Sequence, residues 1–288
     1  MNGVKDRVVV VTGAGRGLGR AYASYLAREG ARVVVNDIGT TLDGHGTDAS
    51  VAQELVAEIR ATGGEAVAST DSVAESAGAA AIVNTAVTAF GRIDAIVSNA
   101  GILRDASFLK MTDDQWEAVL RTHLFGAFYL AKAAWPLWRE QKHGRFVVLA
   151  SSTGLFGNFG QANYGAAKLG VVGLIHTLAI EGAKYNIRAN ALSPMGTTRM
   201  TETVQDDVRA KLFDPAKVAP AVAYLCADEC AETGIVVRSG GGHHARVALM
   251  LSPGIDVDGV PSLAEFAQRW PEVVDMAGAK LGGAVGQF

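Results

Sequence analysis

The sequence is poor in cysteine, in proline and in net charge, and each shortage disfavours a class of protein. Its 288 residues include two cysteines, Cys226 and Cys230, too few for a disulfide framework. Their spacing places them about one helical turn apart. The formal net charge is −3, which argues against the concentrated basic face of a nucleic-acid binder. With 7 prolines and 34 glycines, the composition favours many short turns between regular elements.

Long apolar runs are also missing from the sequence. We find no uninterrupted stretch long enough to cross a bilayer, and the valine run at 8–11 is too short for a secretory signal. The terminal Gly286-Gln287-Phe288 is not a Ser-Lys-Leu type peroxisomal address. We therefore expect a cytoplasmic protein that binds neither membranes nor nucleic acid. No metal site is expected, because His243-His244 and the cysteine pair lie outside common zinc spacings.

What the sequence does contain is an alternation of strand and helix patterns. Residues 8–11 are all valine, which is typical of a strand buried on both faces of a parallel sheet. Further strands are predicted at 32–36, 66–69, 93–98, 146–150 and 188–192, and helices at 18–28, from 48 to about 61, 77–90, 113–139 and 162–185. This alternation predicts an α/β fold with a Rossmann-type doubly wound parallel sheet.

The pattern weakens after Pro194. The remaining predicted elements are a helix at 217–227, strands at 234–237 and 246–251, and an amphipathic helix over 262–280 interrupted at Pro271. No proline- or serine-rich linker and no internal repeat is visible. We predict that residues 1–288 form a single dinucleotide-binding domain with a C-terminal extension from about 250.

A glycine-rich turn follows the first strand. Gly13, Gly17 and Gly19 have the spacing G-x-x-x-G-x-G and open a predicted helix, the setting in which a helix N-terminus binds a pyrophosphate. Arg16 and Leu18 lie in the same turn. A P-loop NTPase is disfavoured because no Gly-Lys-Ser/Thr follows.

Asp37 ends the second predicted strand. A carboxylate there accepts hydrogen bonds from the adenosine ribose and repels a 2′-phosphate, which favours NAD over NADP. Arg16 could attract such a phosphate, although contact with solvent explains it more simply. A solvated acid in a turn is the simpler alternative for Asp37.

Tyr164 and Lys168 lie four residues apart on a predicted helix and so share one face. An ammonium there stabilises the phenolate and lowers a phenol pKa that is ordinarily about 10. Ser151, at the end of the fifth strand, can hydrogen-bond a substrate oxygen. Together with a dinucleotide loop, the three residues indicate carbonyl–alcohol redox chemistry. His123, a lone histidine among apolar neighbours, is by itself more typical of a structural residue.

At these residues the sequence resembles the short-chain dehydrogenase/reductase family, over nearly the whole chain to about residue 250. The family pattern TGxxxGxG is matched by Thr12, Gly13, Gly17 and Gly19, NNAG by Ser98-Asn99-Ala100-Gly101, and the catalytic set by Ser151, Tyr164 and Lys168. Asp71, with Ser72 beside it, matches the acid that contacts the adenine. The cofactor-binding residues so implied are Gly13, Arg16, Gly17, Leu18, Gly19, Asp37, Asp71, Ser72, Asn99, Ala100, Gly101, Tyr164, Lys168 and Pro194.

A narrower resemblance is to the (3R)-hydroxyacyl-CoA dehydrogenase part of peroxisomal multifunctional enzyme type 2. It rests on residues 33–37, 101–105, 157–164 and 178–182, and the long loop at 38–47 fits it. His123 stands where many family members carry an asparagine of the proton relay, so the resemblance implies a relay role for it. Pro194 is followed by Met195 where the family usually has glycine, which leaves the nicotinamide contacts less defined.

The resemblance implies an NAD-dependent oxidoreductase that interconverts a secondary alcohol and a ketone, on a (3R)-3-hydroxyacyl-CoA or a steroid-derived CoA ester. Alternatives are a 3-oxoacyl-carrier-protein reductase using NADPH, a free steroid or terpenoid alcohol dehydrogenase, and a non-catalytic nucleotide-sensing protein. We expect a homodimer or homotetramer. Because no hydratase domain follows in this sequence, a standalone dehydrogenase is expected. Substrate choice is assigned to the loop after Pro194 and to the C-terminal segment.

Overall fold

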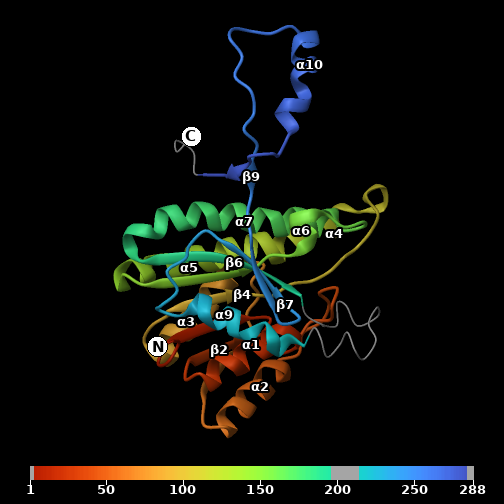
Figure 1. Ribbon diagram of the computed structural model, residues 1–288. Helices are drawn as coiled ribbons and strands as arrows, with labels where there is room; N and C mark the ends of the chain where they lie inside the picture. The colour runs from red at the N-terminus through yellow and green to blue at the C-terminus, as the bar shows by residue number, and fades with distance from the viewer. Residues whose placement is uncertain (1–2, 196–213, 284–288) are drawn as a thin grey trace. The chain divides into compact units, whose positions relative to one another are not determined.

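The structure is a computed structural model that describes residues 3–195 and 214–283 (Figure 1). The chain divides into two compact units, Met1–Ala245 and Arg246–Phe288. The boundary lies close to residue 250, where the sequence predicts the start of an extension; the single-domain assignment itself stays a prediction. Most of the loop after Pro194 lies outside the described residues.

An eight-stranded sheet forms the centre of the first unit, in the order β3-β2-β1-β4-β5-β6-β7-β8. The strands are β1 Val8–Thr12, β2 Arg32–Asn36, β3 Glu65–Ser69, β4 Ala95–Ser98, β5 Gly144–Leu149, β6 Ile187–Met195, β7 Val236–Gly240 and β8 His243–Val247. Strands β1 to β7 pair in parallel. Strands β2 and β3 lie on one side of β1 and strands β4 to β8 on the other, which confirms the predicted Rossmann-type doubly wound fold.

Helices cover both faces of this sheet (Figure 1). Their bounds are α1 Gly17–Arg28, α2 Ser50–Ala61, α3 Ser76–Phe90, α4 Asp113–Leu120, α5 Gly126–Gln141, α6 Ser152–Phe156, α7 Ala162–Gly182 and α9 Ala219–Cys226. Val9, Val11 and Val33 face a fully buried cluster that includes residues of α1, α2 and α9. Helices α3, α5 and α7 pack on the opposite face. The valine run is therefore buried from both sides, as its composition predicts.

The predicted helix at 113–139 is three segments rather than one. Between α4 and α5 lies a π-helical turn, η2 Arg121–Phe125, in which the amide of Gly126 donates to the carbonyl of Arg121. Cys226 ends α9 and Cys230 lies beyond it, so the two thiols do not share a helix. Both are buried and free.

The second unit contains β9 Met250–Leu251, α10 Leu263–Val274 and β10 Lys280–Leu281, with β9 and β10 antiparallel. The strand predicted at 246–251 is divided in the structure, because β8 ends at Val247 and β9 begins only at Met250. The interruption predicted at Pro271 is wrong, because α10 continues through it. A capping box between Ser262 and Glu265 begins this helix. None of its 12 described residues is buried.

Helix α7 with the turn that follows it, Ala162–Tyr185, is long and apolar enough to cross a membrane by length and composition, with a hydropathy of 1.3. It contains Lys168, Glu181 and Lys184, so it is not an uninterrupted apolar stretch. Buried core helices pass the same test, and α7 packs against β6 and α4. Asn163 and Lys168 on this helix are buried. We treat α7 as a core helix.

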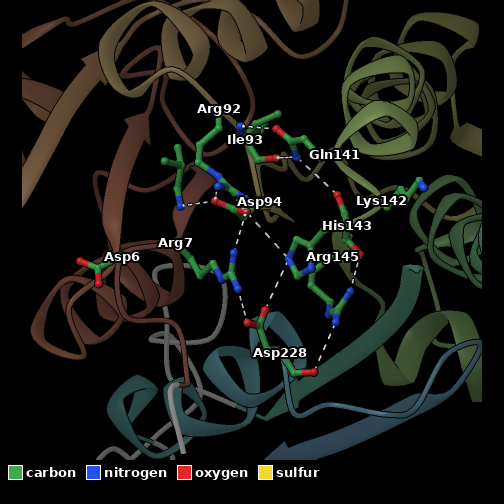
Figure 2. A network of polar contacts seen from close by, with 12 residues as sticks. Asp6, Arg7, Arg92, Ile93, Asp94, Gln141, Lys142, His143, Arg145 and Asp228 are labelled. Carbon is green, nitrogen blue, oxygen red and sulfur yellow. Dashed lines mark hydrogen bonds and ion pairs between the residues drawn. The ribbon is translucent and has the colours of Figure 1, made fainter. Parts of the chain in front are cut away.

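A network of polar contacts lies at the amino-terminal ends of the central strands (Figure 2). Asp94, completely buried just before β4, accepts hydrogen bonds from the amide of Val8 at 2.9 Å and from Arg92 Nη2 at 2.6 Å. Arg7 pairs with both Asp94 and Asp228. His143 Nε2 lies 3.6 Å from Asp228 Oδ1 and 3.9 Å from Asp94 Oδ1. These groups tie the first residues of β1, β4 and β5 together.

Candidate active site

The glycine-rich turn between β1 and α1 is built on close backbone contacts. Gly13 and Gly17 have φ of 62° and 55°, a conformation that costs other residues about 1 kcal/mol or more. A Cβ on Gly19 would lie 2.1 Å from the carbonyl oxygen of Gly13. The predicted glycines are therefore required by the turn that places the N-terminus of α1 beside the sheet.

Asn99 and Thr12 tie this turn to the end of β4. Asn99 Nδ2 donates to the carbonyls of Thr12 at 2.9 Å and Gly13 at 3.1 Å. Thr12 Oγ1 in turn accepts from the amides of Asn99 at 3.0 Å and Ala100 at 3.1 Å. The predicted Asn99-Ala100-Gly101 segment thus links the ends of β1 and β4, the neighbouring strands at which the strand order of the sheet reverses. That position is where doubly wound sheets bind ligands.

Asp37 directly follows β2 and is held by two backbone amides. Oδ2 accepts from Gly15 at 2.8 Å and Oδ1 from Gly39 at 2.7 Å. Each carboxylate oxygen has a second lone pair, so the fixed carboxylate can still accept hydrogen bonds from a ligand hydroxyl. It is a positioned acceptor rather than a freely solvated turn residue.

Asp71 and Ser72 follow the neighbouring strand β3. Asp71 Oδ2 accepts from Ser69 Oγ at 3.0 Å, and the carbonyl of Asp71 accepts from buried Asn36 Nδ2 at 2.9 Å. Ser72 Oγ accepts from the amide of Ala74 at 3.2 Å. The two residues therefore lie in an ordered turn beside Asp37's strand.

Ser151, Tyr164 and Lys168 meet on the other side of the switch point, beyond β5. Ser151 begins α6, where its Oγ accepts from the amide of Thr153 at 3.2 Å. The buried ammonium of Lys168 donates to the carbonyl of Leu149 at 2.5 Å and lies 5.5 Å from the centre of the Tyr164 ring. The structure thus brings the three predicted catalytic residues to one place.

Protonation of the pair differs from the sequence-based expectation. Burial raises the pKa of Tyr164, and a hydrogen bond with Ser151 opposes that rise. Burial lowers the pKa of Lys168 to about 7. Within the chain itself, then, the downward effect on the Tyr164 pKa comes from Ser151 and not from Lys168.

His123 lies in the π-helical turn and contacts Tyr164 edge-on, with 5.1 Å between ring centres. Its Nε2 lies 2.9 Å from the carbonyl oxygen of Ile102 and 3.2 Å from the Ile102 amide. Burial, followed by the charge of Lys168, lowers the pKa of His123 well below its usual value, so the ring is neutral. Its Nδ1 has no hydrogen-bond partner among the described atoms. A relay through His123 stays a prediction, and it would use Nδ1.

Gly101 explains how the ring of His123 fits. A Cβ on Gly101 would lie 2.2 Å from His123 Cε1, so only glycine leaves room for the imidazole here. The last glycine of the Asn-Ala-Gly motif therefore serves His123 as well as the turn.

One cavity of about 410 Å³ joins these groups. All of the predicted cofactor-binding residues line it, as does His123; Ser151 does not. Lining residues that the sequence analysis missed include Ile38, Thr40, Thr41, Leu42, Gly44, Val73, Ile102, Arg104, Arg121 and Thr122. The loop at 38–47 was a visible signal for the first five. Ile102 and Arg104 lie in the segment 101–105 on which the narrower resemblance rests. Val73, Arg121 and Thr122 had no signal, because they reach the cavity through tertiary packing.

The lining fits a nicotinamide dinucleotide. The N-terminus of α1 opens on the cavity, Asp37 and Asp71 lie on the β2–β3 side, and Tyr164 and Lys168 on the β5–β6 side. In the described ranges 3–195 and 214–283, no group of three or more His, Cys, Asp or Glu could hold a metal ion.

Comparison with known proteins gives the same family. The family model for short chain dehydrogenases matches residues 7–210. The short-chain type dehydrogenase/reductase Rv0148 of Mycobacterium tuberculosis is 56% identical over 98% of this chain and 99% of its own. A solved short chain dehydrogenase from Mycobacterium avium is 40% identical with a TM-score of 0.83, covering 98% of both chains.

A longer relative is peroxisomal multifunctional enzyme type 2 of Drosophila melanogaster. It is 42% identical over 98% of this chain, and the chain spans 47% of its length. Its full-length structure superposes with a TM-score of 0.82. Enzymes of this family use NAD(P). That the Ser151–Tyr164–Lys168 set carries the chemistry stays a prediction. By these matches the chain is an enzyme of the short-chain dehydrogenase/reductase family.

Proposed function

We propose that this enzyme uses NAD to interconvert a secondary alcohol and a ketone on a (3R)-3-hydroxyacyl-CoA or a steroid-derived CoA ester. The observation that carries the proposal is the shared cavity of Asp37, His123, Tyr164 and Lys168, a combination that joins a ribose acceptor to a proton-transfer group. Similarity to multifunctional enzyme type 2 over nearly the whole chain supports the acyl-CoA substrate.

Each residue has a separate task in this proposal. When bound, the dinucleotide supplies the hydride transfer. Tyr164 Oη removes the hydroxyl proton during oxidation, and Ser151 holds the substrate oxygen next to it. Lys168 binds the nicotinamide ribose and contributes positive charge. His123 passes the proton on towards solvent. The protein's contribution is position and charge.

Selectivity for NAD rests on Asp37. Because two backbone amides fix its carboxylate, the negative charge cannot turn away from a 2′-phosphate. Like charges close together in a partly buried site cost several kcal/mol. Arg16 lines the same cavity but is exposed at its edge, and we give it no part in selectivity.

The test is NADH formation by the purified enzyme with (3R)-3-hydroxyacyl-CoA, in parallel with NADP and with the (3S) isomer. Turnover confined to the (3R) ester with NAD is expected. Activity only on a free steroid alcohol, or only on a carrier-protein thioester with NADPH, would refute the CoA assignment. Tyr164→Phe separates enzyme from sensor: turnover should fall by about a thousandfold or more while dinucleotide binding persists.

We also propose that the enzyme is a homodimer or homotetramer in the cytoplasm. Analytical ultracentrifugation that shows only monomer would overturn the first statement. Cell fractionation that places the protein in membranes would overturn the second.

A further inference from the structure

The long loop between β2 and α2 is a folded element, which we name the strap and define as residues 38–48. The amide of Asp48 donates to the carbonyl of Ile38 at 2.9 Å and closes its base. At its tip, Thr41 and His45 are joined by a backbone hydrogen bond of 2.9 Å, and the His45 amide also donates to Thr41 Oγ1 at 3.0 Å. Its tip therefore has a shape of its own.

The strap tip docks on the segment that follows β4. The amide of Leu103 donates to the carbonyl of Leu42 at 3.1 Å, and Arg104 Nε donates to the carbonyl of Asp43 at 3.0 Å. Gly44 lies against Ile102, where an added Cβ would be 3.1 Å from Cγ2. Two hydrogen bonds and one apolar contact thus hold the tip.

The base of the strap is attached across the cavity, at the glycine-rich turn. Arg16 Nη1 contacts the carbonyl of Thr40 at 3.5 Å, and the amide of Gly39 donates to Asp37. Residues of the strap and of both attachment points line the cofactor cavity. The strap therefore crosses the cavity between the residues of the phosphate turn and the segment after β4.

Arg104 connects this strap to the catalytic helix. Its side chain holds the strap tip, while its carbonyl accepts from Asn163 Nδ2 at 3.0 Å. Asn163 is completely buried at the start of α7, and its Oδ1 accepts from the amide of Tyr164 at 2.7 Å. One residue thus touches both the wall of the cofactor cavity and the support of Tyr164.

We propose that Arg104 is a positioning residue that keeps the strap closed over the dinucleotide, so that opening of the strap sets the rate of dinucleotide release. The inference rests on the proposed dinucleotide-dependent function. In this proposal, the dinucleotide leaves after the hydrogen bonds from Arg104 and Leu103 to the strap break. Entry passes through the same open conformations, so loosening the strap should not slow association.

The test compares Arg104→Met with Arg60→Met in the full chain. Each arginine donates its Nε to a backbone carbonyl, Arg104 to Asp43 at 3.0 Å and Arg60 to Ala66 at 2.9 Å, but Arg60 does not line the cavity and does not contact the strap in the described residues. The matched control therefore removes the same charge and the same kind of hydrogen bond without releasing the strap. NADH release and association are measured by stopped-flow fluorescence. Hydrogen exchange of peptides covering 39–45 and Leu103 is measured without dinucleotide.

We expect Arg104→Met to release NADH about three- to tenfold faster, as loss of one hydrogen bond predicts, and to associate no more slowly than the wild type. Exchange of the strap peptides should rise in the same variant. Arg60→Met should leave release and exchange within about twofold of the wild type, and Arg104→Lys, which keeps a donor, should recover part of the loss.

Thr41→Val supplies a second variant on the exposed strap itself, where misfolding of the core is not a concern. It removes the Thr41 Oγ1 hydrogen bonds and should also speed release. Equal release rates in the two arginine variants, with unchanged strap exchange in Arg104→Met, would overturn the proposal. If the wild type binds neither NADH nor NADPH, the proposed function fails instead, and the exchange data still decide whether Arg104 holds the strap.

Discussion

Acidification should destabilise this protein through His143 in the network at the amino-terminal ends of the central strands. Burial lowers the pKa of His143 to about 4, and the positive charges of Arg145 and Arg7 add to that lowering. Asp228 and Asp94 oppose it. Because an unfolded histidine has a pKa of about 6.5, the unfolded chain binds a proton between pH 6.5 and 4 that the folded chain does not. The free energy of unfolding therefore falls as the pH falls through this window.

The size of the effect follows from the shift. Lowering the pKa from 6.5 to about 4 corresponds to a total loss of about 3 kcal/mol in the free energy of unfolding on acidification. About 2 kcal/mol of this is lost by pH 5. The side chain of His143 is 10% exposed, so little of this is screened by solvent. Among protein stabilities of about 5–15 kcal/mol, such a loss is large.

The assay is urea unfolding of the wild type and of His143→Asn at pH 7, 6 and 5. The difference between their free energies of unfolding should move by about 2 kcal/mol in favour of the variant between pH 7 and 5. His45→Asn replaces a histidine whose side chain is 70% exposed and serves as the control. A difference that stays constant within about 0.5 kcal/mol across this range would refute the reasoning.

Four further predictions follow, three of them on residues that line the cavity. Asp37→Ala should raise kcat/KM for NADP relative to NAD by about tenfold or more, and an unchanged ratio in steady-state kinetics would remove Asp37 from selectivity. Gly101→Ala should lower both activity and the free energy of unfolding, by about 1–3 kcal/mol for the latter, because its Cβ overlaps the His123 ring. Gly173→Ala, where a Cβ meets nothing within 4 Å, should instead raise the melting temperature. Asn99→Ala should cost about 1–3 kcal/mol in denaturant unfolding, since the Gly13 turn loses its donor.

The sheet and most helices could be predicted because their signals are local. The runs at 8–11 and 32–36 mark buried strands by composition alone, and β2 has the bounds that the sequence predicts. The strand predicted at 246–251 is divided between β8 and β9 by residues 248–249. The helical region predicted at 113–139 is confirmed, but its π-helical turn was not predicted because such a turn has no clear sequence signature.

The catalytic set was predictable because its residues follow a fixed spacing on strand ends and on one helix face. Arg121 was not, because it reaches the cavity only after distant segments pack. The direction of the Tyr164 pKa shift was also out of reach, since burial raises that pKa and the hydrogen bond with Ser151 opposes the rise. Sequence patterns give the identity of such residues, whereas the electrostatic balance depends on the folded surroundings.

The π-helical turn at Arg121–Phe125 has a consequence for chain length. Its hydrogen bond from Gly126 to Arg121 spans one residue more than an α-helical bond, so the turn holds one residue in excess of a regular helix. Deleting a residue such as Leu124 would remove this excess and restore an unbroken α-helix, so the faces of α4 and α5 would keep their register. The change would fall instead on the turn itself, where His123 contacts Ile102 and Tyr164. A single-residue deletion here should therefore disturb the site of His123 more than the packing of α4 and α5.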